Sequence, residues 1–235
     1  MALARQGHLS YTQMGDICMA TLSQLVEAIA EVEGMDSATV ALIARTVREA
    51  GLITTGGRGP SAGKMTVADA ANLLIAVNTS ASAREAPDRV RKYRQLEMRS
   101  AEESKLLSTF GDAIEQLILA CNSRTLPKVF LSMAMPRLLS QKAIKSVDIY
   151  FHNKFRADIN ISVDSWGILG LYSNGSSLTS LTARKANRVV NLSCRFRSPN
   201  DDWFPGDQQI VTKISVDTIK RVFSVLEYGP MNRQP

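Results

Sequence analysis

The spacing of apolar residues changes along this chain, and that change most constrains the fold. In the first half, apolar side chains recur every three or four residues, as in Leu22, Leu25 and Ile29, which predicts amphipathic helices. After Pro127 they alternate with polar residues, in 147–152 and again in 157–163, which predicts half-buried strands. We therefore predict an α+β protein.

Capping signals divide the first third into helices. Thr21 with Gln24, and Thr66 with Asp69, have the spacing of capping boxes, and Gly34 stands where glycine ends a helix. The predicted helices cover 21–34, 36–50 (capped by Asp36 or Ser37) and 66–77. The second helix has an inward stripe of Val40, Ile43, Ala44 and Val47.

A glycine-rich segment, residues 54–65 (TTGGRGPSAGKM), separates the second and third helices. It holds four glycines, one proline, two bases and no acid, and the preceding Leu52 and Ile53 could begin a strand. A phosphate-binding loop is excluded by spacing, because Met65 stands where Ser or Thr is required and Arg58 where the first glycine is required. The predicted order of elements is therefore that of a winged helix-turn-helix: a helix, a turn, a second helix, a glycine-rich basic hairpin and a third helix.

The second helix is the predicted DNA-reading element, because a helix fits the major groove. Its outer face carries Arg45, the best candidate for guanine O6/N7 contact. Ser37, Thr39 and Arg48 suit phosphate contacts, and so do Thr55, Arg58 and Lys64 of the glycine-rich segment. Glu49 is compatible with phosphate nearby only if it pairs with Arg45 or Arg48 at helical spacing.

In arrangement, this part of the chain resembles the winged helix-turn-helix regulators of the MerR type. Residues 47–53 (VREAGLI) stand where the family's second helix gives way to its wing, and 65–77 stand where its post-wing helix begins with a capped acidic turn. The basic-aromatic residues usual in that wing are absent, and the turn before Asp36 is longer. The glycine-rich wing with the AANLLIAV helix also looks like regulators encoded in prophages. The resemblance implies DNA binding, and it reaches about 55 of 235 residues.

We predict three parts: a winged helix-turn-helix in 1–80, a helical linker or dimerisation segment in 81–125, and a β-rich dimerisation or effector domain in 126–235. Residues 78–87 read as a linker, and 88–121 as helical with a break near 98–100 and a new cap at Ser100. The basic run from Arg89 to Arg94 offers an alternative track for phosphates. A last helix is predicted over 216–226, with Ile219, Val222, Phe223 and Leu226 facing inward. Most helix-turn-helix proteins bind DNA as dimers, so we expect a homodimer. The favoured dimer interface is formed by the β-rich part together with the last helix.

Composition argues against catalysis. Three distant cysteines and two histidines form neither a zinc pattern nor a nucleophile–base–orienter triad, so we expect no enzyme, no catalytic residues, no metal and no cofactor. No apolar run approaches the roughly 20 residues that span a bilayer, and the first residues lack a secretion signal, so we expect a cytoplasmic protein with no membrane partner. The net charge of +6 favours a polyanionic partner.

The leading hypothesis is therefore a sequence-specific, homodimeric transcriptional regulator of double-stranded DNA. A DNA-packaging protein like a small terminase subunit, which would assemble as a ring, is the alternative. A nuclease is disfavoured, because Asp, Glu and His do not cluster in the sequence.

Overall fold

The computed structural model describes residues 20–56, 63–98, 109–123, 142–152, 155–168, 185–198 and 211–228. Its helical elements are α1 (Leu22–Glu33), α2 (Ser37–Glu49), α3 (Val67–Thr79), the 3-10 turn η3 (Ala83–Glu85), α4 (Ala86–Arg94), α5 (Phe110–Ser123) and α7 (Val216–Tyr228). Its strands are β1 (Glu97–Met98), β2 (Lys142–His152), β3 (Arg156–Ile168), β4 (Lys185–Arg197) and β5 (Val211–Ser215). Helices with an antiparallel sheet confirm the predicted α+β class.

The predicted caps are confirmed. The Thr21 backbone N–H donates to Gln24 Oε1 at 2.8 Å, and Gly34 ends α1 with a left-handed φ of 64°. Asp36 accepts from the Thr39 backbone N–H at 3.0 Å and begins α2. Thr66 and Asp69 form the predicted capping box of α3. Local side-chain chemistry thus determines where these helices begin.

The connection between α2 and α3 differs from the expected wing. Leu52 and Ile53 lie in a bend, so the expectation that they could begin a strand is wrong. The reason is Gly51, whose φ of 75° reverses the chain directly after α2, and Ile53 is then buried in the core. No strand occurs in the described residues 51–56 and 63–66, so we call this segment the glycine-rich loop (54–65).

The predicted linker at 78–87 is instead ordered structure. Helix α3 continues to Thr79, Asn78 is buried, and η3 and the start of α4 follow at once. Asn78 can remain in the helix because its side-chain amide donates to the Leu74 carbonyl at 3.0 Å. The predicted helix over 88–121 is divided into α4, the short strand β1 and α5, and its expected cap at Ser100 lies outside the described residues.

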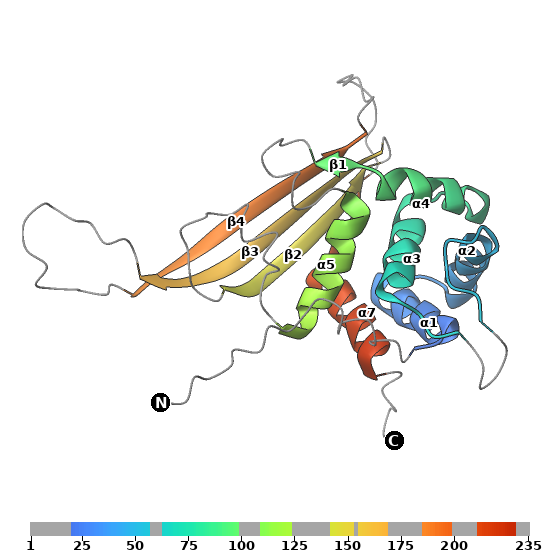
Figure 1. The fold of residues 1–235 in the computed structure, drawn as a ribbon, viewed down its shortest axis with the longest axis horizontal. Coiled ribbons are helices and arrows are strands. Elements are labelled where there is room, and N and C mark those ends of the chain that lie inside the picture. Colours follow the sequence, from blue (N-terminus) through green and yellow to red (C-terminus); the bar gives the residue numbers. More distant parts are fainter. Residues whose placement is uncertain are drawn as a thin grey trace, which may run out of the picture.

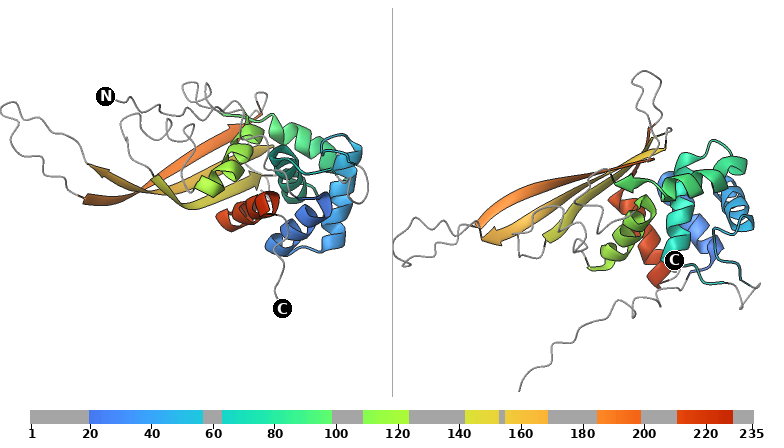
Figure 2. Two further views of the ribbon diagram at one scale, coloured as in Figure 1. Left: turned by 60° about the horizontal axis from the view of Figure 1, so that its bottom comes forward. Right: turned by 45° about the horizontal axis from the view of Figure 1, so that its top comes forward.

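The sheet has the strand order β1-β4-β3-β2-β5, and all the neighbouring strands are antiparallel. The predicted strand segments 147–152 and 157–163 lie in β2 and β3, which pair with Ile149 opposite Ile159. The inner face of the whole sheet is buried. Its buried side chains include Val147, Ile149, Phe151, Ala157, Ile159, Ile161, Cys194, Phe196 and Ile214. Figure 1 shows α5 and α7 against the sheet, and the two views of Figure 2 show β3 and β4 extending beyond the helices.

Helix α7 joins the end of the described chain to its beginning. Its predicted inward residues Ile219, Val222, Phe223 and Leu226 are buried, and Arg221 donates to Glu31 of α1 at 2.8 Å. Burial raises the pKa of the nearby Glu33 carboxyl, against the opposing effect of its hydrogen bond with Thr218. The apolar face of α7 is therefore packed within the same chain, and the contact between copies expected of this helix stays a prediction.

Buried residues of helices and sheet belong to one continuous cluster. The division into three domains stays a prediction, although the core runs through all the parts that were assigned to them. None of the described helices combines the length and apolar character that crossing a membrane requires.

Arg94 ties together three helices at the centre of this arrangement. Its guanidinium donates to Asn72 Oδ1 on α3 at 2.8 Å and to Glu115 on α5 at 2.5 Å. Asn72 in turn donates to the Leu52 carbonyl at 2.5 Å, which holds the turn after α2. Gly111 makes this possible, because a Cβ there would lie 3.0 Å from Arg94 Nε.

We expect Arg94→Ala to lower the free energy of unfolding by about 2 kcal/mol, because it leaves Asn72 and the largely buried Glu115 without their charged partner. Urea denaturation measures this. The matched control is Arg84→Ala, which removes an exposed arginine from the neighbouring η3 and should leave the midpoint unchanged. Equal stability of both variants would contradict a role for Arg94 in joining the helices.

Candidate nucleic-acid interface

Helix α2 has one face in the core and one in solvent. Val40, Ile43, Ala44 and Val47 are buried, as their spacing predicts. In Figures 1 and 2 the helix lies at the end of the molecule opposite the extended strands. Its exposed residues are Ser37, Ala38, Thr39, Ala41, Leu42, Arg45, Arg48 and Glu49. The sequence-predicted residues of this helix therefore share an accessible surface.

Arg45 is held by Glu49 on this surface. Its Nε donates to Glu49 Oε1 at 2.8 Å, one helical turn away, and the two side chains are 70% and 60% exposed. This hydrogen bond and the carboxylate charge raise the pKa of Arg45 above its ordinary value. Arg45 was one of the two partners that the sequence predicted for Glu49. Their pairing orients the Arg45 guanidinium and leaves it exposed.

The N-terminal turn of α2 uses part of its polar chemistry internally. The Thr39 hydroxyl donates to Asp36 Oδ2 at 3.2 Å, beside the cap made by its own backbone N–H. Its hydroxyl is therefore part of the cap in this structure, and the phosphate contact expected of Thr39 stays a prediction. Ser37 is exposed at the first position of the helix.

The two arms of the glycine-rich loop meet at its base. A Cβ on Gly63 would lie 3.0 Å from the Gly56 backbone, so a larger residue there would push the two arms apart by a few tenths of an ångström. The Met65 backbone N–H donates to the Ala20 carbonyl at 2.8 Å, which attaches the second arm to the start of α1. Thr55 and Lys64 are exposed, one on each arm, whereas Arg58 lies outside the described residues.

Asp69 fixes both arms at once. Its side chain is 4% exposed, and it accepts from the Thr54 backbone N–H, the Thr66 backbone N–H and the Thr66 hydroxyl, each at 2.8 Å. The spacing of Thr66 and Asp69 predicted that Asp69 takes part in the helix cap. It could not predict the contact of Asp69 with Thr54, because these two residues are fifteen positions apart. Asp69 is thus the residue that positions the loop beside the helices.

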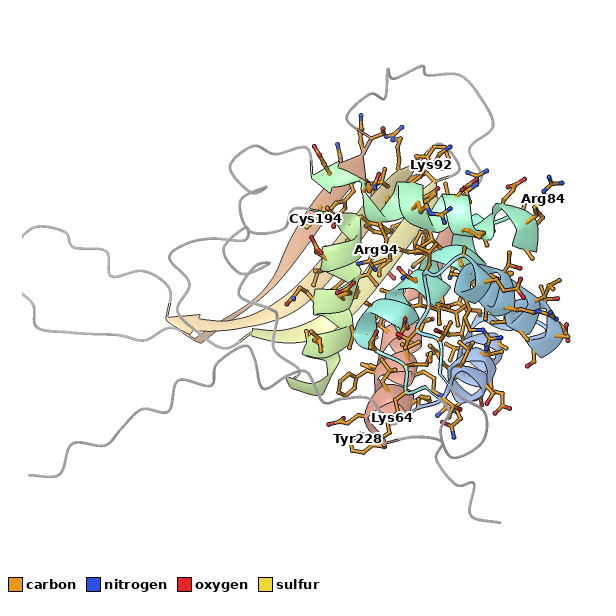
Figure 3. The ribbon with its side chains drawn as sticks, turned by 45° about the vertical axis from the view of Figure 1, so that its right-hand side comes forward. Lys64, Arg84, Lys92, Arg94, Cys194 and Tyr228 are labelled. Atoms are coloured by element: carbon orange, nitrogen blue, oxygen red, sulfur yellow. The ribbon has the colours of Figure 1, made fainter. Side chains whose placement is uncertain are left out.

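The basic residues of α4, which the sequence offers as an alternative track for phosphates, also contact groups of their own chain. Arg89 and Lys92 lie over the Phe155 ring, 5.1 and 4.6 Å from its centroid, and Arg94 is bound as described above. Arg91 pairs with Asp88 and lies 3.4 Å from the Ala50 carbonyl at the end of α2. Figure 3 places Arg84, on η3, and Lys64, on the glycine-rich loop, on opposite sides of the helical unit.

Other chemistry is sparse in the part of the chain that the structure describes. No group of three or more His, Cys, Asp or Glu side chains is arranged there to hold a metal ion. Cys194 is buried on the inner face of β4 and forms no disulfide with any described residue. The chain matched no protein-family model, no curated protein and no solved structure in comparisons with each.

We expect Asp69→Ala to lower the free energy of unfolding by about 2 kcal/mol and to speed tryptic cleavage at the loop, because three donors lose their buried acceptor. Urea denaturation and the cleavage rate at Arg58 and Lys64 measure the two effects. Asp36→Ala is the control: it removes only a helix cap, so it should destabilise by about 1 kcal/mol with little change in cleavage. Unchanged cleavage in Asp69→Ala would show that the aspartate does not position the loop.

Proposed function

We propose that this chain binds double-stranded DNA and regulates transcription in a sequence-specific manner, with α2 as the reading helix. The observation that supports this most directly is the exposed face of α2 at the free end of the molecule, with Arg45 held in place by Glu49. A helix of 13 residues is about 20 Å long and about 10–12 Å wide, and the major groove of B-DNA is about 12 Å wide.

Arg45 is the proposed base contact. Glu49 engages its Nε, and the described residues provide no hydrogen-bond partner for its two terminal nitrogens. Those nitrogens form the fork that matches O6 and N7 of guanine. The carboxylate of Glu49 is neutralised by the same pairing, which removes the repulsion from phosphates that an isolated acid would cause.

Contacts to the DNA backbone are assigned to residues on either side of this helix. Ser37 and Arg48 lie on its flank, and Thr55 and Lys64 lie on the two arms of the loop that Asp69 fixes. Arg58 keeps the same role as a prediction from the sequence. Such contacts set the position of the protein on the duplex and carry no sequence information directly.

The proposed regulator acts as a homodimer, in the compartment that holds the DNA. Two copies of α2 about 34 Å apart would read half-sites one helical turn apart, which multiplies the affinity of a single helix. Because α7 is packed within its own chain, we assign the contact between copies to the sheet.

We expect Arg45→Ala to weaken binding to a selected site by roughly 5- to 150-fold, because a bidentate contact to guanine contributes about 1–3 kcal/mol of discrimination. Binding to random DNA should fall much less. Fluorescence anisotropy measures both, with a site recovered from genomic fragments by the purified protein.

The matched control is Arg48→Ala, which removes the same charge from the same helix. Its proposed phosphate contact should make it weaken specific and random binding to a similar extent. If Arg45→Ala also weakened both equally, α2 would not read bases through this residue. Failure of the wild-type protein to bind any DNA would overturn the proposal itself.

Lys64→Gln should weaken specific and random binding alike and reduce the slope of log K against log salt concentration by about one unit, because each phosphate contact releases one counterion. Titrations at several salt concentrations measure the slope. Lys220→Gln makes the same charge change at an exposed position on α7 and should leave the slope as it is. Equal slopes for Lys64→Gln and the wild type would remove the loop from the interface.

A further inference from the structure

Leu42 is an exception on the reading face. Its side chain is 57% exposed, and the other exposed large apolar residues in the described part of the chain, Val211 and Tyr228, lie on β5 and at the end of α7. Leu42 stands in the middle of α2, three residues before Arg45, on the face that the core leaves free. Both side chains therefore project on the same side of the helix, one turn apart.

The residues around Leu42 leave it prominent. Ala38 and Ala41 are exposed and small, so neither covers it. The Thr46 hydroxyl donates to the Leu42 carbonyl at 3.0 Å, and the Thr39 hydroxyl donates to Asp36. These two hydroxyl protons are bound to their own helix. At the centre of the exposed face, Leu42 and the pair of Arg45 and Glu49 therefore remain for a partner, with Ser37 and Arg48 on the flank.

The size of this apolar spot indicates what would cover it. A specific protein interface buries on the order of 1,000 Å² or more, with several apolar residues at its centre. One leucine between alanines and an ion pair provides far less than that. A single methyl group is the matching target, and on the base edges of the major groove the methyl group is C5-methyl of thymine.

We propose, on the basis of the DNA binding proposed above, that Leu42 reads the C5-methyl group of a thymine beside the guanine read by Arg45. Three residues of helix rise about 4.5 Å, and successive bases on a DNA strand are about 3.4 Å apart. Leu42 and Arg45 therefore face adjacent base pairs. Target sites contain a thymine next to that guanine, and cytosine is disfavoured at this position because it lacks the methyl group.

The test replaces each thymine of a recovered site, one at a time, by deoxyuridine, which removes only the methyl group. For the wild-type protein, one substitution should weaken binding about fourfold, the effect expected of burying one methyl-sized group. For Leu42→Ala, the same substitution should have no effect. Because Leu42 is exposed, the variant should keep the wild-type urea midpoint, which shows that its fold is intact.

Three results would overturn this assignment. The wild type shows no sensitivity at any thymine, Leu42→Ala keeps the wild-type sensitivity, or Leu42→Ala changes self-association in light scattering while the deoxyuridine effect stays. In each case the response to Arg45→Ala still tests whether α2 reads DNA. Absence of any DNA binding by the wild type overturns both proposals, so their failures are distinguishable.

Discussion

The guanidinium of Arg94 is the interaction on which the arrangement of the helices depends. It joins α3 to α5 by hydrogen bonds to Asn72 and Glu115. Asn72 in turn donates a hydrogen bond to the Leu52 carbonyl, directly after α2. A partly buried charge with two polar partners on different helices permits few alternative packings, because each alternative leaves one of them unsatisfied. The position of the proposed reading helix relative to the sheet is therefore specified by a polar network as well as by apolar burial.

Sequence reasoning succeeded where structure is determined within a few residues. The capping pairs, Gly34, the stripe of α2, the β2–β3 hairpin and the last helix follow from local chemistry and period. It failed where distant residues decide. Leu52 and Ile53 have strand character, but Gly51 turns the chain and Asn72 holds it there. The polar stretch after Val77 is ordered because Asn78 satisfies its amide inside α3, which composition does not reveal.

The sequence predicted only part of the candidate site, because contacts between distant residues decide the rest. The face of α2 and the pairing of Arg45 with Glu49 follow from helical spacing. The contact of Asp69 with Thr54, and the use of Arg89 and Lys92 on Phe155, depend on segments that meet only in the folded molecule. The basic residues in the sequence of α4 therefore indicate the charge of this helix. They do not indicate whether that charge is available to a partner, because these residues also contact groups of their own chain.

The contact between α1 and α7 has a consequence for how the protein is made. Arg221 and Glu31 are separated by 190 residues, so the apolar side of α1 has no cover from α7 until nearly all of the described chain has left the ribosome. Contacts of such long sequence separation slow folding and keep apolar surface exposed for longer. Newly made chains should therefore keep this side of α1 exposed until synthesis of the described chain is almost finished, and chaperones can bind that surface during this time.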